Sequence, residues 1–286
     1  MTLETKHTVA DALARAAAKL QAAGIDDARR EASSLMAFAI GKNSAFIFAH
    51  PEYELTDAES AAFEVAVERR AEREPFHYIV GTKEFYGLNF FVAPGVLIPR
   101  PETELLVQDA MNILGELPTP RFLEIGAGSG CISVAILHNL PAATAVAVDI
   151  SETALGIAAK NAEWHKVADR LALKHGDVYR AIEGEFELIV SNPPYIPDAD
   201  LATLQTEVGG FEPHSALFGG SDGLDIVRRI IADAPKFLAK SGHILIEIGF
   251  GQACSVKGLF DEAIWCEIGF VQDLQGIDRI AKAKLR

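Results

Sequence analysis

The chain has 286 residues, 49% hydrophobic and 23% charged, which is typical of a folded protein and excludes a fibrous or largely disordered chain. This length suggests one large domain or two smaller ones. Asp and Glu total 40 against 26 for Lys and Arg, which gives a formal net charge of −14. Because an acidic surface repels phosphate backbones, we expect no direct nucleic-acid binding.

Cysteine usage and hydropathy indicate the compartment. The cysteines Cys131, Cys254 and Cys266 lie in no CxxC pair, so we expect reduced thiols and neither a disulfide framework nor a metal site. The chain starts without a basic segment followed by an apolar run, and no stretch is long enough and apolar enough to span a membrane. These features predict a cytoplasmic protein without membrane contact, with a monomer as the default state.

Residues 1–75 are predicted to form a helical domain. Apolar residues recur there at helical spacing, and capping residues separate the repeats. The expected helices run from Thr8 toward Gly24, from Asp26 or Asp27 to Gly41, over Ser44–Ala49, and from a capping box at Thr56–Glu59 to about Glu74.

Residues 76–99 are predicted to link this domain to a second one through a β-hairpin, since Lys83–Val92 is aromatic and β-branched with turn residues inside. A helix is expected over Glu102–Leu114, after Pro101.

Residues 100–286 are predicted to form an α/β domain. Apolar strands alternate with helices, which indicates a mostly parallel sheet covered on both faces. The expected strands are Phe122–Ile125, Ala145–Asp149, Leu171–His175, Glu187–Ser191 and His243–Ile248, and the expected helices are Cys131–Leu140, Glu152–His165 and Leu224–Leu238. The tail from Ile264 to Leu285 is expected to add an antiparallel pair.

A glycine-rich loop, Glu124-Ile-Gly-Ala-Gly-Ser-Gly130, follows the first of these strands. Its glycines permit a tight turn and a close approach of the backbone to a ligand, and Asp149 at the end of the next strand can bind a ribose hydroxyl pair. The spacing GxGxG differs from the dinucleotide fingerprint GxGxxG. An acidic residue before the loop suits a cationic amino-acid end better than a pyrophosphate. The loop therefore favours S-adenosylmethionine as the cofactor.

The tetrapeptide Asn192-Pro-Pro-Tyr195 follows another strand and so faces the same crevice. An amide nitrogen is a poor nucleophile, but two acceptors can hold its N–H groups and turn its lone pair toward a methyl donor. The Asn192 side-chain oxygen and the Pro193 carbonyl can be these acceptors, stiffened by the two prolines. Tyr195 offers a flat face to a planar group. This pattern predicts methyl transfer to a planar NH₂ group.

In the order and spacing of its motifs the whole chain resembles the HemK/PrmC family of peptide-chain release factor N(5)-glutamine methyltransferases. The shared motifs are Phe76–Gly81, Ile98–Glu104, Glu124–Gly130, Val148-Asp149, Asn192–Tyr195, Phe211–Pro213 through Gly219–Gly223, Glu247–Gly249 and Asp273–Arg279. The resemblance implies a class I (Rossmann-like) S-adenosylmethionine-dependent methyltransferase domain behind a small helical-bundle domain and a β-hairpin linker. The implied protein partner is a class 1 release factor, whose Gly-Gly-Gln glutamine is methylated. The resemblance also implies that the helical domain of residues 1–75 recognises this substrate by contacting the rest of the release factor.

The same resemblance implies the site residues. Cofactor-binding residues would be Gly126, Ala127, Gly128, Ser129, Gly130, Asp149, Asp177, Val178 and Asn192. Asn192, Pro193 and Tyr195 would be catalytic, and the substrate would be held by Asn192, Pro193, Pro194, Tyr195, Arg100, Glu102 and Thr103. The chain departs from the family pattern at Glu124 (more usually Asp), Cys131 (commonly Ala or Gly) and Val178 (often aromatic).

Three other functions compete with this interpretation. An adenine-N6 nucleic-acid methyltransferase also uses Asn-Pro-Pro-Tyr, but the charge of −14 disfavours it. A non-catalytic protein that kept the fold is disfavoured by the intact tetrapeptide. A NAD-dependent oxidoreductase is disfavoured by the loop spacing.

Overall fold

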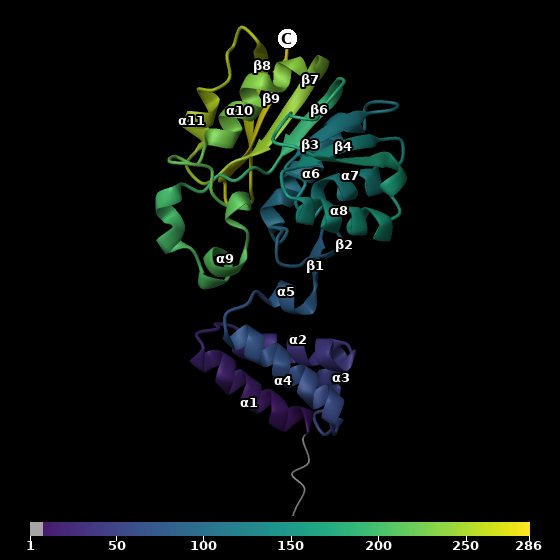
Figure 1. Cartoon of the computed structure of the whole chain (residues 1–286), viewed down its shortest axis with the longest axis vertical. Coiled ribbons are helices and arrows are strands. Elements are labelled where there is room, and N and C mark those ends of the chain that lie inside the picture. The colour runs from purple at the N-terminus through teal and green to yellow at the C-terminus, as the bar shows by residue number, and fades with distance from the viewer. Residues whose placement is uncertain (1–7) are drawn as a thin grey trace, which may run out of the picture. The chain divides into compact units, whose positions relative to one another are not determined.

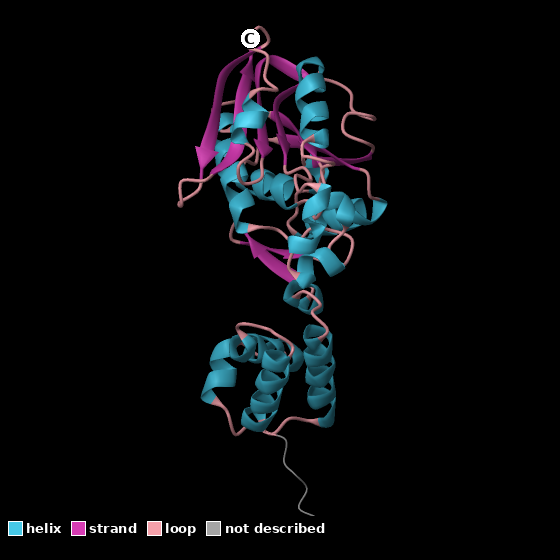
Figure 2. Cartoon of the chain, turned by 90° about the vertical axis from the view of Figure 1, so that its left-hand side faces the viewer, coloured by secondary structure: helices cyan, strands magenta, loops and turns pink. Residues whose placement is uncertain are grey.

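The computed structural model describes residues 8–286, which divide into two compact units. One unit contains the described residues up to Gly81 together with the segment Thr206–Phe211, and it is helical. The other contains Thr82–Gln205 and Glu212–Arg286 and is built around a β-sheet. Figure 1 traces the chain through both units, and Figure 2 shows helices in the first and the mixture of strands and helices in the second.

The helical unit follows the capping signals of its sequence. Its helices are α1 (Val9–Ala22), α2 (Ala28–Ile40), α3 (Ser44–Ala49), α4 (Asp57–Ala71) and α5 (Phe76–Val80). Helix α9 (Thr206–Phe211), from later in the chain, also belongs to this unit. The Thr8 side chain accepts a hydrogen bond from the Asp11 amide, and Thr56 and Glu59 form the predicted capping box. Gly41 ends α2 at φ 65°, a conformation that glycine adopts without a Cβ penalty. The predicted bundle is confirmed.

Helix α5 lies where only a hairpin was expected. Pro75, with φ −54°, precedes its first turn, and Gly81 ends it in the left-handed conformation at φ 74°. The hairpin itself is shorter, with β1 (Thr82–Phe85) paired antiparallel to β2 (Leu88–Phe91). Five residues are too few to show a helical period by themselves, which is why the pattern did not reveal α5.

Ion pairs bind α9 into the helical unit, although its residues come from much later in the chain. Arg70 in α4 is 6% exposed, and its guanidinium binds Glu31 and, at 3.0 Å, Glu207. Arg73 reaches the other oxygen of Glu207 at 2.7 Å. These two ion pairs neutralise the carboxylate of Glu207 and hold the first turn of α9 beside Arg70 and Arg73.

The second unit has a seven-stranded sheet in the order β5-β4-β3-β6-β7-β9-β8. Its strands are β3 (Arg121–Ile125), β4 (Thr144–Asp149), β5 (Leu171–His175), β6 (Phe186–Ser191), β7 (Leu238–Glu247), β8 (Trp265–Gln272) and β9 (Asp278–Leu285). The first five in this order pair in parallel, and β9 pairs antiparallel with both β7 and β8. The expected α/β fold with its antiparallel tail is confirmed.

Side chains on the central strands pack against helices on both faces. The helices of this unit are α6 (Glu104–Leu114), α7 (Cys131–Asn139), α8 (Glu152–Trp164), α10 (Asp225–Asp233) and α11 (Ala253–Lys257). Phe122 and Leu188 pack with residues of α6 and α7, whereas their chain neighbours Leu123 and Ile189 pack with residues of α10 and α11. Because both faces are covered, these strands have no polar face.

Two predicted boundaries are wrong around Pro235. Helix α10 ends at Asp233 and a 3₁₀ turn follows over Ala234–Lys236, because proline cannot donate an N–H and clashes with the preceding helical turn. Strand β7 therefore begins at Leu238, which pairs with Phe186, five residues before the predicted start. No helix in the described part of the chain is long and apolar enough to cross a membrane.

Candidate active site

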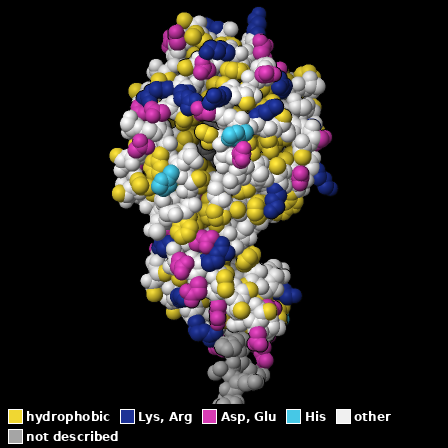
Figure 3. Space-filling model, viewed as in Figure 1, with side chains coloured by type: hydrophobic (Ala, Val, Ile, Leu, Met, Phe, Trp, Pro, Cys, Tyr) yellow, Lys and Arg dark blue, Asp and Glu magenta, His cyan; other side chains and the backbone are white. Residues whose placement is uncertain are grey.

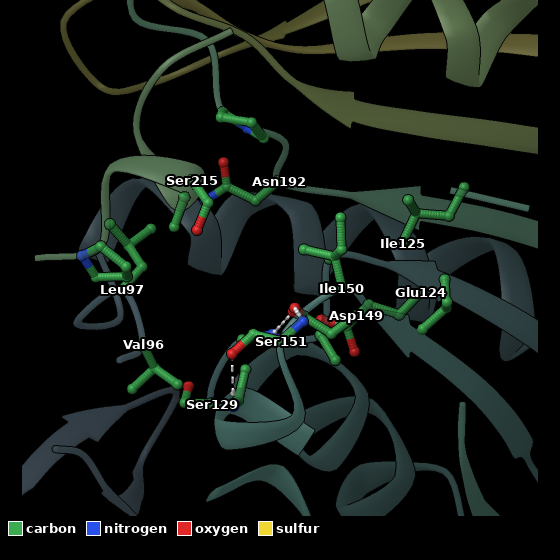
Figure 4. A pocket seen from close by; sticks show the side chains of 18 of the residues that line it. Val96, Leu97, Glu124, Ile125, Ser129, Asp149, Ile150, Ser151, Asn192 and Ser215 are labelled. Carbon is green, nitrogen blue, oxygen red and sulfur yellow. Dashed lines mark hydrogen bonds between the residues drawn. The ribbon is translucent and has the colours of Figure 1, made fainter. Parts of the chain in front are cut away.

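A cavity of about 380 Å³ lies in the sheet unit, at the carboxyl ends of its parallel strands. Its walls include Gly126–Ser129 after β3, Asp149–Ser151 after β4, Gly176–Val178 after β5 and Asn192 after β6. Figure 4 shows Asn192 and Ser215 on one side of it and Ser129, Asp149 and Ser151 on the other. This is the position at which open α/β sheets bind ligands, and the volume suits a small cofactor.

The glycine loop is held by Asp149. One carboxylate oxygen of Asp149 accepts a hydrogen bond from the Gly128 amide and the other accepts one from the Ser151 amide, both at 2.8 Å. Gly126 and Gly128 have positive φ angles of 80° and 53°, so a residue with a Cβ would be strained there. Asp149 therefore joins the loop after β3 to the loop after β4, beside the space where a ribose is expected.

A second anchor of the loop was not foreseen. Asn161 in α8 is fully buried, and its side-chain amide donates to the carbonyls of Ser129 and Phe91 at 2.8 and 3.0 Å while accepting from the Phe91 amide. The loop and strand β2 are thus fixed to one helix. An asparagine on a helix gives no local sign of such partners.

Glu124 is the buried acidic group of the cavity. It is 1% exposed, and its Oε2 accepts hydrogen bonds from the amide and hydroxyl of Ser133. Its Oε1 has no hydrogen-bond partner among the described residues. The pKa of Glu124 is raised to about 8, mainly by burial and slightly by the nearby charge of Asp149, against the two hydrogen bonds from Ser133, which lower it. An unpartnered acidic oxygen in the cavity wall fits the cationic amino-acid end of S-adenosylmethionine.

Asp177 and Val178 line the cavity at the end of β5, as predicted for the adenine side. The Asp177 carboxylate is paired with Arg229 at 2.7 Å. Val178 has a φ of 55°, an uncommon and strained conformation for a β-branched residue. Val178 and Ile226 together make this wall apolar.

Asn192 is oriented by a neighbour from another loop. Its side-chain Nδ2 donates to the hydroxyl oxygen of Thr103 at 3.0 Å, which leaves Oδ1 free of that contact. Both residues line the cavity. In this orientation the bond to Thr103 uses the NH₂ end of the Asn192 amide. An oxygen presented to the cavity is the acceptor that the two-acceptor hypothesis requires.

Arg100 also lines the cavity, and a buried carboxylate holds its side chain. Glu212, 3% exposed, binds Arg100 at 2.5 Å through one oxygen and accepts from the Ile98 amide at 3.2 Å through the other. Glu212 lay in a motif of the family pattern but had no predicted role. The sequence gives no sign that Glu212 pairs with Arg100, because the two residues are 112 positions apart in the chain.

Four of the predicted site residues do not line the cavity: Gly130, Glu102, Pro193 and Tyr195. Gly130 precedes α7 at φ 77°, and a Cβ at this position would lie 3.1 Å from the Cβ of Ala158. Glu102 is exposed and Pro193 is buried. The Tyr195 hydroxyl lies 3.5 Å from Oε1 of Glu247, and burial raises its pKa, so it stays protonated.

The described residues give little support to catalysis by a cysteine nucleophile or by a metal ion. Cys131 lines the cavity, but burial and the charge of Glu124 raise its pKa to about 12, so it is a thiol and no nucleophile. Within residues 8–286 no group of three or more His, Cys, Asp and Glu side chains is placed to hold a metal ion. Figure 3 shows acidic and basic side chains interspersed on the visible face.

Comparison with known proteins gives the family. The model described as PrmC N-terminal domain matches residues 11–81, and the Methyltransferase small domain matches residues 101–207. A methyltransferase structure from Pyrococcus furiosus, 17% identical, has a TM-score of 0.52 over 71% of this chain and 91% of its own, which shows a shared fold.

Two curated relatives are much more similar. A release factor glutamine methyltransferase of Geobacter sulfurreducens is 43% identical over 92% of this chain and 91% of its own length. One of Cereibacter sphaeroides is 43% identical over 96% of this chain and 98% of its own length. The chain therefore belongs to the family of S-adenosylmethionine-dependent release factor glutamine methyltransferases.

Proposed function

We propose that this enzyme transfers a methyl group from S-adenosylmethionine to the side-chain amide nitrogen of the glutamine in the Gly-Gly-Gln motif of class 1 release factors. The observation that carries the proposal is the placement of Asn192. Its Nδ2 is bound to Thr103, so its Oδ1 is available to the cavity that also contains the glycine loop and Asp149. Acceptor and cofactor loop thus share one cavity.

The cofactor side would be held by groups whose positions are known. Gly126–Ser129 would approach the cofactor with backbone, Asp149 would accept from the ribose hydroxyls, and Glu124 would pair with the ammonium. Asp177 and Val178 would border the adenine. When bound, S-adenosylmethionine supplies an electrophilic methyl carbon on its sulfonium. Gly130 would act by packing and not by contact.

The substrate side would position the glutamine amide. Asn192 Oδ1 would accept one of its two N–H bonds, and the carbonyl of Pro193, which lies between the lining residues Asn192 and Pro194, would accept the other, so that the lone pair faces the methyl donor. Tyr195 would flank the amide, Pro194 and Arg100 would border it, and Thr103 would orient Asn192. A general base is not required, because the nitrogen becomes acidic once methylated and then loses its proton. Glu102, being exposed, would act at the mouth.

The helical unit would contact the rest of the release factor, as expected for residues 1–75. The enzyme carries a formal charge of −14, so we infer that the release factor offers a more basic surface. Added salt should then raise KM for the release factor. A KM that does not change with salt would contradict this electrostatic inference. We further infer a cytoplasmic, monomeric enzyme.

The test is methylation with a labelled methyl donor in three parallel reactions: a release factor, the same factor with its Gly-Gly-Gln glutamine replaced by alanine, and unmethylated DNA. We expect label on the first alone. Label on DNA but not on protein would establish the adenine-N6 alternative. Label on both forms of the release factor would show that another residue is the acceptor.

A further inference from the structure

Arg100 brings a permanent positive charge into the wall of the cavity, and a buried carboxylate lies directly behind it. Glu212 does not line the cavity, and its side chain is 1% exposed, against 31% for that of Arg100. Its Oε1 accepts from Nη2 of Arg100 at 2.5 Å, and its Oε2 accepts from the Ile98 amide at 3.2 Å. Both oxygens of Glu212 therefore hold the segment that carries Arg100.

The two segments joined by this ion pair line the same cavity. Leu97 and Arg100 line it from one segment, and Pro213 and Ser215 line it from the segment that begins at Glu212. Figure 4 shows Leu97 and Ser215 among the residues around the cavity. Joining two loops would be a purely structural role for Glu212. Any further role has to depend on its charge.

The cations among the described lining residues are Arg100 and Arg229, and each has a carboxylate partner. Arg229 pairs with Asp177 at 2.7 Å within the wall, where the two side chains are 46% and 42% exposed. Water screens a pair that is this exposed. Glu212, in contrast, is shielded from water, so its charge acts on Arg100 almost unscreened.

The charge of the cofactor makes this compensation important. S-adenosylmethionine carries an ammonium, a carboxylate and a sulfonium, so it is positive overall. S-adenosylhomocysteine, which remains after methyl transfer, has a neutral sulfur and no net charge. An uncompensated guanidinium in the wall would repel the sulfonium but not the thioether. The cavity would then bind the product in preference to the methyl donor.

We propose that Glu212 is a positioning residue that acts through Arg100: it holds and neutralises the guanidinium in the cavity wall, so that the cavity accepts the positive sulfonium of the methyl donor. This role concerns cofactor binding and goes beyond the proposed function, because no release factor takes part in it. It also accounts for a buried acid that has no contact with the cavity. Burial of a carboxylate is costly unless it is paired and hydrogen-bonded, and both oxygens of Glu212 are bonded.

The test is the ratio of two dissociation constants, Kd for S-adenosylmethionine divided by Kd for S-adenosylhomocysteine, measured by isothermal titration calorimetry. The two ligands have nearly the same shape and differ by a methyl group and by the charge on sulfur. A purely structural disturbance of the cavity changes both Kd values by a similar factor and leaves the ratio unchanged. A change in the charge of the wall changes the ratio.

Glu212→Gln removes the charge, keeps the size of the side chain and leaves Arg100 uncompensated. We expect the ratio to rise by roughly three- to tenfold, the effect of one unit charge over about 10 Å in a partly hydrated site. Combining Glu212→Gln with Arg100→Met removes both charges, and the ratio should return to within about twofold of the native value. This recovery is expected only if Glu212 acts through Arg100.

Glu187→Gln is the matched control. Glu187 lies near the amino end of β6, where it accepts from the Arg121 amide at 2.8 Å outside the cavity. The change removes one negative charge from the same unit, as Glu212→Gln does, but it leaves no cation of the cavity wall uncompensated. The ratio should therefore keep its native value.

Two results would overturn the proposal: a native ratio in Glu212→Gln, or a raised ratio that persists when Arg100→Met is added. If Glu212→Gln does not fold, Arg100→Met alone tests the same charges at pH 8. The uncompensated carboxylate should then lower the ratio by roughly three- to tenfold, and an unchanged ratio would refute the role of Glu212. The titrations contain no release factor, so their outcome is independent of whether the proposed function holds.

Discussion

Replacing Glu124 by glutamine tests whether its buried carboxylate binds the ammonium group of S-adenosylmethionine. Glu124 is the acidic cavity residue whose Oε1 has no partner among residues 8–286 and whose pKa burial raises to about 8. In the free enzyme near neutral pH it is therefore mostly protonated. A cationic ligand group prefers the ionised carboxylate, so binding should remove the proton.

The magnitude follows from this pKa. At pH 7 a group of pKa about 8 is protonated in about ten molecules for each ionised one, so binding should release about 0.9 proton. The ionised fraction falls about ninefold between pH 7 and pH 6, and Kd should rise by about the same factor, or about 1.3 kcal/mol. The ligand ammonium stays charged throughout this range.

Isothermal titration calorimetry measures both quantities, because the released proton adds the ionisation enthalpy of the buffer to the observed heat. Titrations in two buffers of different ionisation enthalpy give the proton count for the native enzyme and for Glu124→Gln. Loss of a charge-assisted bond of about 1.5–3 kcal/mol should raise Kd by roughly 10–100-fold in the variant, with no proton release. Native binding without proton release would refute the assignment, as would a variant whose Kd equals the native value.

The other predictions concern turnover, stability and pH. Asn192→Ala should lower kcat by about 10²–10³-fold while calorimetry still detects cofactor binding, and near-normal turnover would contradict the two-acceptor hypothesis. Arg70→Met leaves the carboxylates around it without their shared cation and should lower the free energy of unfolding in urea by about 3–5 kcal/mol, whereas Glu68→Ala, at an exposed ion pair, should change it little. Equal effects of these two changes would show that burial does not strengthen the Arg70 pairs. Burial raises the folded-state pKa of Glu124 to about 8 and of Glu247 to about 7, both above the usual 4.5, so their protonation stabilises the folded protein. This contribution to stability is complete below about pH 4.5 and is lost as pH rises through 7 and 8. Between pH 5 and 8, Tm should therefore fall less steeply in the Glu124→Gln, Glu247→Gln double variant than in the native protein. An equal slope of Tm against pH in the two proteins would contradict this reasoning.

Most elements of the fold were predictable because their signals are local. The capping box at Thr56–Glu59, the glycine after α2 and the strand–loop–helix at Glu124–Gly130 each depend on residues a few positions apart. The sequence did not reveal two short helices, and it placed two element boundaries wrongly around Pro235. Helices α5 and α9 are too short for a period to show. The predicted helix Leu224–Leu238 ran through Pro235, where the structure has a 3₁₀ turn and then the start of β7.

The residues that line the cavity were predictable to a similar degree, since Gly126–Ser129, Asp149 and Asn192 all follow apolar strands. The carboxyl ends of parallel strands meet at one edge of a sheet, so these groups had to converge. The anchors behind them were not predictable. Asn161, Glu212 and Glu247 bind residues far away in the sequence, and nothing near them in the chain shows those partners.

The sequence by itself determined an acidic two-part chain whose second part carries a cofactor loop and an amide-binding tetrapeptide on one sheet. Spacing and hydropathy are sufficient for this, because backbone conformation and burial are set largely by neighbouring residues. Only the tertiary structure decided which way the Asn192 amide faces. In the folded protein the NH₂ end of this amide is bound to the hydroxyl of Thr103, which lies 89 positions earlier in the chain. A hydrogen bond requires its partners within about 3 Å, and chain distance carries no such information.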